Sequence, residues 1–257
     1  MNNTSVNETE GRLAGAAIRR TVRSTTLAMT VAVSVLLLAT LSSASGAAAP
    51  DAKAQYSSMA PLRLYLDDRD TEIAMARSAA PDAISRDATI MVLTDHGYVT
   101  AAEGKNGFVC MVERAWMSPE DSPTFWDPHL RGPICFNPPA ARSILPATFE
   151  RTKLAIAGKS KSEIVAANKQ AYDDKQLPPL EPGSMSFMMS KRGYLTATGG
   201  NLAHVMIYTP HSDPPTWGND VPNSPVMLNP QFKDAEPIDV WVISVGKWSD
   251  GTPAPVM

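Results

Sequence analysis

The sequence has few of the features that identify common enzymes and nucleic-acid-binding proteins. Its two cysteines, Cys110 and Cys135, lack the CxxC partners of a structural zinc site. It contains no G-x-G-x-x-G or G-x-S-x-G motif, and Lys153 stands where a phosphate-binding loop ending at Gly158-Lys159-Ser160 needs its first glycine. A net charge of −3 gives no positive surface for a nucleic acid. The sequence therefore predicts no metal, no cofactor and no nucleic-acid partner.

The N-terminal apolar run is short for a membrane helix. Residues 27–41 span about 15 positions, whereas a helix that crosses a bilayer needs roughly 20. Four arginines precede this run and an alanine-rich stretch follows it, which is the layout of a cleaved export signal. We therefore predict an export signal with a flexible junction at residues 1–54, a periplasmic or secreted location, and no membrane span after cleavage. Small residues allow cleavage at three points: after Ala47, Ala49 or Ala54.

Proline is absent before Pro50, so all 22 prolines fall in the remainder of the chain. This is about twice the usual frequency of proline and indicates long, irregular surface loops. Residues 55–257 are enough to form one sizeable hydrophobic core. We therefore predict a single domain over this range.

Two segments of the sequence resemble each other at a spacing of 96 residues. When residues 97–109 are aligned with residues 193–205, six of 13 positions are identical, and glycine turns fall at corresponding places between runs typical of strands. We therefore interpret residues 88–113 and 184–209 as an internal repeat, each copy a three-stranded meander. The alternative is a chance similarity between two β-rich stretches.

Helix signals flank these segments. Three helices are expected. Their start and stop signals are Asp68 or Asp70 and Pro81, Pro146 and Gly158, and the Ser160–Glu163 capping box and Pro178. A further apolar strand is expected at residues 238–245. The sequence thus predicts an α+β fold, with an antiparallel sheet of two duplicated meanders plus one further strand, covered by three or four short helices.

Four segments together resemble a family of exported bacterial proteins that is uncharacterised. They are residues 76–81, the hairpin at 97–114, the loop at 132–138 and residues 246–251. The resemblance covers most of the chain after the leader and implies a periplasmic or secreted location. It supplies no activity, cofactor or functional residue.

Two cysteines in an oxidising compartment predict a disulfide between Cys110 and Cys135. In the chain-entropy model, closing this loop stabilises the fold by about 3–4 kcal/mol. Two alternatives remain open. Cys110 aligns with Met206, so a buried free thiol fits that position, and Cys135 could act as a nucleophile assisted by a histidine, as in thiol hydrolases.

Long proline-rich loops at residues 118–133 and 210–230 supply the candidate ligand site, because loops of this length in a compact domain are either functional or disordered. Aromatic side chains beside histidine, arginine and aspartate are typical of a small-ligand site. The candidates are Trp126, His129, Arg131, His204, His211, Trp217 and Asp220. Alternatively, the tryptophans only hold the loops against the body, and His204 is a buried structural histidine.

The sequence thus predicts an exported globular domain of unknown activity that binds a small molecule or peptide at a rim formed by the two proline-rich loops. Two other functions stay open: a hydrolase that uses Cys135 or a loop histidine, and a purely structural envelope protein. The sequence does not decide whether the protein is an enzyme.

Overall fold

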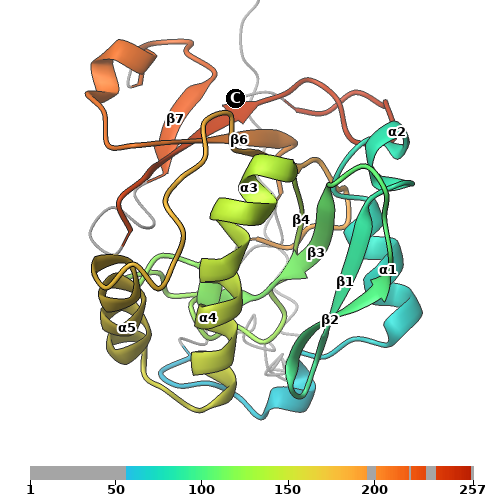
Figure 1. Cartoon of the computed structure of the whole chain (residues 1–257). Coiled ribbons are helices and arrows are strands. Elements are labelled where there is room, and N and C mark those ends of the chain that lie inside the picture. Colours follow the sequence, from blue (N-terminus) through green and yellow to red (C-terminus); the bar gives the residue numbers. More distant parts are fainter. Residues whose placement is uncertain (1–55, 196–200, 220, 230–235, 256–257) are drawn as a thin grey trace, which may run out of the picture. The chain divides into compact units, whose positions relative to one another are not determined.

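The computed structural model describes residues 56–195, 201–219, 221–229 and 236–255. The chain divides into two units, Met1–Ala48 and Ala49–Met257, and the description concerns the second. The expected export signal and the candidate residue Asp220 lie outside the described residues. At the centre is a sheet with the strand order β2-β1-β3-β4-β5-β6-β8-β7 (Figure 1).

The described elements are mostly antiparallel strands with helices on the sheet, which confirms the predicted α+β class. The strands are β1 (Thr89–Thr94), β2 (Gly97–Ala102), β3 (Val109–Glu113), β4 (Gly132–Phe136), β5 (Met185–Met188), β6 (His204–Thr209), β7 (Val226–Asn229) and β8 (Asp239–Ser244). The α-helices are α1 (Arg69–Arg77), α2 (Asp82–Ser85), α3 (Pro138–Ser143), α4 (Leu145–Ile156) and α5 (Lys161–Asp173). Short 3-10 helices are η1 (Leu62–Leu64), η2 (Ala115–Met117) and η3 (Pro214–Trp217). No helix in the described ranges is long and apolar enough to cross a membrane.

The helix ends follow the capping residues in the sequence. The Asp68 side chain accepts a hydrogen bond from the backbone N–H of Thr71 at the start of α1. At α5, Ser160 and Glu163 form the expected reciprocal capping box. Gly158 follows α4 with a φ of 76°, a conformation that glycine adopts without steric cost. These three helices were therefore correctly predicted.

The duplicated meander is not confirmed. In the first segment β3 lies beside β1 and runs parallel to it, whereas in the second segment β5 and β6 are antiparallel neighbours. The connection from β2 to β3 passes over the start of β1 at Gly104, where a Cβ would lie 2.1 Å from the backbone nitrogen of Thr89. Because glycine lets the chain pass this close to the start of β1, β3 reaches the far side of that strand. The two segments therefore have different strand connections.

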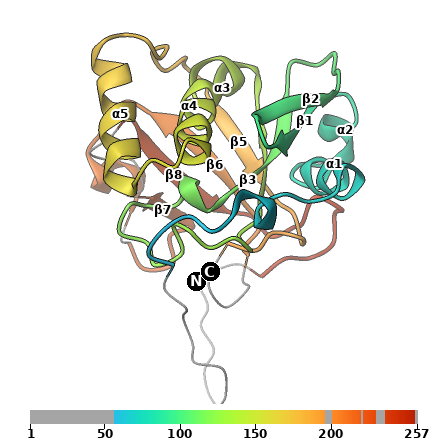
Figure 2. The same cartoon turned by 90° about the horizontal axis from the view of Figure 1, so that it is seen from below.

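The residues of β3 and β4 alternate between two hydrophobic layers. Cys110, Cys135 and their neighbours pack against Ala76 of α1 and the alanines that follow this helix. Met111, Ile134 and Phe136 pack with residues of α3 and α4. Helices α3, α4 and α5 gather on the same side of the sheet (Figure 2). The candidate functional site lies between α4 and the sheet, on this side.

The predicted disulfide is confirmed. Cys110 and Cys135 stand directly opposite each other on β3 and β4 and are bonded. Both are fully buried, so the bond joins two central strands within the layer beneath α1.

Candidate functional site

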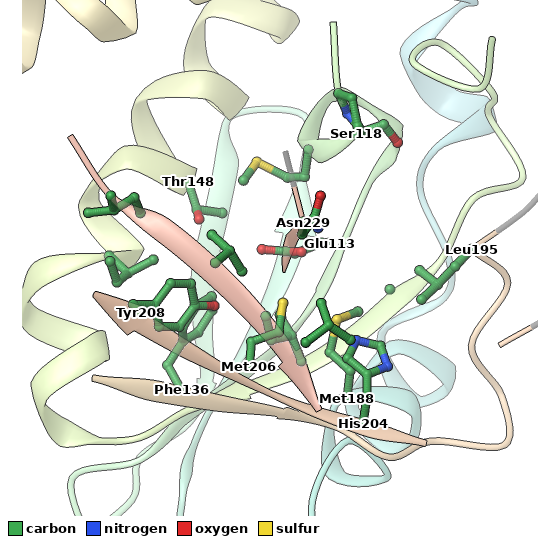
Figure 3. A pocket seen from close by; sticks show the side chains of 18 of the residues that line it. Glu113, Ser118, Phe136, Thr148, Met188, Leu195, His204, Met206, Tyr208 and Asn229 are labelled. Carbon is green, nitrogen blue, oxygen red and sulfur yellow. The ribbon is translucent and has the colours of Figure 1, made fainter. Parts of the chain in front are cut away.

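A cavity of about 710 Å³ lies between the sheet and helix α4 (Figure 3). Its volume is within the range of roughly 300–1,000 Å³ that is usual for small-molecule sites. Its wall is mainly apolar, with Met117, Leu130, Ile134, Phe136, Ile144, Met188, Leu195, Met206, Ile238, Val240 and Val242. The polar and charged residues that face it are fewer: Glu113, Arg114, Ser118, Thr148, Asn201, His204, Tyr208, Asn229 and Glu236.

The pleat of the sheet determines which side chains reach the cavity. Glu113 follows Met111 by two residues, so both lie on the face of β3 that looks toward α4. On the neighbouring strand Gly132 stands opposite Glu113. A Cβ at Gly132 would lie 3.1 Å from Leu195 Cδ2 and 3.2 Å from Met188 Cε, closer than ordinary contact. The missing side chain at Gly132 therefore keeps space open beside Glu113.

Both proline-rich loops border this cavity. Ser118, Pro119 and Leu130 belong to the first loop, and Met227, Leu228 and Asn229 belong to the second. The second loop reaches the cavity because its last residues form β7, which pairs with β8 at the edge of the sheet. Two segments more than 80 residues apart in the sequence thus meet around one space.

Glu113 is the most unusual polar group in the cavity. Its carboxyl group points into the cavity (Figure 3) and makes no hydrogen bond or ion pair with any described residue. Part of its surface stays accessible through the cavity, yet the group lies deep within the protein, and this burial raises the pKa of Glu113 to about 8. The charge of Arg151 opposes this rise and that of Glu236 adds to it. Glu113 is therefore mostly protonated at pH 7.

His204 lies in the same wall from strand β6 (Figure 3). Its Nδ1 is 2.7 Å from the carbonyl oxygen of Leu202, which can only accept, so Nδ1 carries the proton and donates it. Burial lowers the pKa of His204, which keeps the imidazole neutral. Its Nε2 is therefore an acceptor, and no described residue donates to it.

A buried ionic cluster closes one side of the cavity. Glu236 lies 3.4 Å from Arg151, measured from Oε1 to Nε, and accepts a 2.7 Å hydrogen bond from Asn168 Nδ2. Burial raises the pKa of Glu236, while the guanidinium of Arg151 acts in the opposite direction. The cluster joins α4, α5 and the segment before β8, so its first role is to hold these elements together.

Arg114 also borders the cavity, but its guanidinium is bound within the protein. Its Nη2 lies 2.8 Å from Glu72 Oε2, and its Nε donates to the carbonyl oxygen of Tyr65 at 2.7 Å. Glu72 in turn accepts a hydrogen bond from the backbone N–H of Leu93. Arg114 therefore fastens α1, β1 and β3 to one another and is not available to a ligand.

Of the residues predicted from the first loop, none lines the cavity. Trp126 is buried, and its carbonyl oxygen accepts a hydrogen bond from the hydroxyl of Tyr65. His129 has an exposed side chain with Nδ1 3.1 Å from Asp127 Oδ1. Arg131 binds both carboxylate oxygens of Asp67, at 2.6 and 3.0 Å. These contacts attach the loop to the body.

The two described candidates from the second loop lie elsewhere, and among all the described candidates only His204, on β6, faces the cavity. His211 Nδ1 is 3.0 Å from Asp239 Oδ1, and the imidazole is half exposed. Trp217 stacks on Trp241, with ring centroids 4.9 Å apart. The structure thus places His211 and Trp217 outside the cavity.

Sequence reasoning missed Glu113, Glu236 and Gly132. A signal for Glu113 was present, because Val109 and Met111 form one face of an otherwise apolar strand and Glu113 is the next residue on that face. The other two depend on strand pairing. Within the described ranges, no group of three or more histidine, cysteine, aspartate or glutamate side chains is placed to hold a metal ion.

Comparisons of this chain with family models, with curated proteins and with solved structures found no match. The function therefore has to be argued from the chemistry of the cavity itself.

Proposed function

We propose that the protein is an exported binding protein that holds a small, largely apolar molecule in the cavity between the sheet and α4. The observation that carries this proposal is an apolar cavity of about 710 Å³ that contains polar groups without partners among the described residues. Such a combination is typical of a ligand site, because the apolar wall supplies affinity and a few polar groups orient the ligand.

Location outside the cytoplasm is part of the proposal. The disulfide between Cys110 and Cys135 supports it, because such bonds persist in oxidising compartments and are rare in the cytosol. The export signal expected at residues 1–54 points the same way. The two loops that border the cavity give the ligand its proposed route of entry.

A hydrolase remains the second candidate, on the basis of His211. Its contact with Asp239 orients one ring nitrogen, as in a general base held by a carboxylate. However, the hydroxyl of Ser212 hydrogen-bonds to Asp239 and not to His211. Cys135 carries no free thiol, because it is bonded to Cys110. Ester hydrolysis that is lost in His211→Ala would support this candidate over simple binding.

Binding of N-phenyl-1-naphthylamine, an apolar dye that fluoresces in dry sites, tests the proposed function. We expect saturable binding of one dye per chain and a loss of at least about tenfold in affinity in Gly132→Val, whose added side chain fills the cavity. Thr100→Val introduces the same residue at an exposed position of β2 and should bind the dye normally. No saturable binding, or equal affinity in both folded variants, would refute the proposal.

A further inference from the structure

We propose that the ligand of this cavity is an apolar molecule with a protonated amine, and that the carboxyl group of Glu113 is the residue that recognises the amine. This inference rests on the proposed function and adds the chemical class of the ligand to it.

The charges around the cavity favour a cation over an anion. The guanidinium groups of Arg114 and Arg151 are paired with Glu72 and Glu236, at 2.8 and 3.4 Å. Within the described part of the chain, a ligand carboxylate would therefore meet no cation that is not already engaged by a protein carboxylate. It would instead approach the oxygens of Glu113 and Glu236, which is unfavourable when either is ionised.

Among the residues that the structure describes, the titratable groups still available in the cavity are Glu113 and His204, and both can accept hydrogen bonds. Glu113 has no partner among the described residues and becomes an acceptor through both oxygens once it is ionised. His204 presents an unprotonated Nε2 because its Nδ1 proton is donated to Leu202. An ammonium group has three N–H donors and no acceptor, which complements such a surface. A protonated amine would also supply the counter-charge that Glu113 lacks, and hydrogen bonds between charged groups are the stronger ones.

Binding of an amine should release a proton from Glu113. The ammonium enters in its charged form, Glu113 ionises to pair with it, and the carboxyl proton passes to the solvent. The charged or titratable groups that act on Glu113 from neighbouring elements are Arg151, Glu236, Tyr98 and Tyr208. Burial raises the pKa of both tyrosines above the working range, so between pH 6 and 8 they stay neutral. The affinity should therefore rise about tenfold per pH unit up to about pH 8.

Three probes with one apolar body and different head groups test this inference by isothermal titration calorimetry: 4-phenylbutylamine, 4-phenylbutan-1-ol and 4-phenylbutyrate. We expect the amine to bind at least tenfold more tightly than the alcohol at pH 8, and the carboxylate to bind most weakly. In two buffers of different ionisation heat, the amine should release close to one proton at pH 7, and the alcohol should release none.

Glu113→Gln should lose at least tenfold in affinity for the amine and change its affinity for the alcohol by less than about threefold. Glu113→Asp retains a carboxyl group and should keep part of the preference for the amine over the alcohol. This variant tests the inference if Glu113→Gln folds poorly. Glu103→Gln makes the same change at an exposed position and is the matched control.

The outcomes separate the two proposals. If none of the three probes and no dye bind, the proposed function fails and this inference fails with it. If the alcohol binds as tightly as the amine, or if the amine binds Glu113→Gln as tightly as the unmodified protein, the cavity is a ligand site but Glu113 does not select an amine.

Discussion

Replacing Glu113 by glutamine should make the protein more stable at neutral and alkaline pH. In the folded protein burial raises the pKa of Glu113 to about 8, from the ordinary glutamate value of 4.5 that applies to the unfolded chain. Below pH 4.5 both states are protonated, so the carboxyl imposes no penalty. As the pH rises from 4.5 to 8, the unfolded state releases a proton that the folded state keeps, and the stability contributed by the protonated group is lost.

The size of this effect follows from the interval between the two pKa values. Each unit of difference corresponds to about 1.4 kcal/mol, so the upper bound at pH 8 is about 5 kcal/mol. Because the Glu113 side chain faces a cavity that water can enter, we expect about 2–4 kcal/mol. Glutamine has nearly the same shape and no charge, so Glu113→Gln should not lose stability as the pH rises. At pH 8 its unfolding free energy should therefore exceed that of the unmodified protein by this amount.

Urea unfolding at intervals between pH 4.5 and 9 measures the difference in unfolding free energy between Glu113→Gln and the unmodified protein. The difference should be small at pH 4.5, grow with pH and level off above pH 8. Glu103→Gln is the control at an exposed position. A difference that stays flat, falls with pH, or appears equally in the control would refute the reasoning about the cavity.

Three further predictions concern the fold. Glu72→Gln should destabilise the protein by about 3 kcal/mol in urea unfolding at pH 7, because it leaves the buried guanidinium of Arg114 without its closest carboxylate. Replacing Cys110 and Cys135 together by alanine should cost up to about 3–4 kcal/mol, and reducing agent should lower the melting temperature only of the unmodified protein. Gly104→Ala should prevent folding, as judged by circular dichroism and urea unfolding, because its Cβ would overlap the backbone at the start of β1.

The helices could be predicted from the sequence because their signals are local. The caps at Asp68 and Ser160 and the stop at Gly158 involve residues within one turn of the helix end. Residues that are adjacent in the sequence are therefore enough to locate the helix ends. The disulfide was predicted for a similar reason, since two cysteines in an oxidised protein allow one pairing.

The strand connections could not be predicted in the same way. Residues 132–138 were expected to form a loop, and this was wrong, because Gly132 and Pro133 open β4, which is buried along its whole length between β3 and β5. Proline is unusual in a central strand because it cannot donate a hydrogen bond to the neighbouring strand. The parallel position of β3 likewise depends on the contact of Gly104 with Thr89, which lies 15 residues away in the sequence.

The sequence indicated the position of the cavity only in outline, for a physical reason. The sequence indicated the two loops, and both border the cavity. Their aromatic residues, however, attach the loops, because a large ring such as that of Trp126 or Trp217 is most stable when it packs on the body. The cavity face is built instead from alternate residues of paired strands, and pairing is not visible in any one segment.

Glu72 and Glu113 provide a comparison within one protein. Both are glutamates placed among apolar side chains, but Glu72 accepts hydrogen bonds from Arg114 and from the backbone of Leu93, while Glu113 has no partner among the described residues. The same change to glutamine should therefore destabilise the fold at position 72 and stabilise it at position 113. A buried carboxyl that weakens the fold is expected where its partner comes from outside the protein, because polar groups that serve only the fold are paired within it.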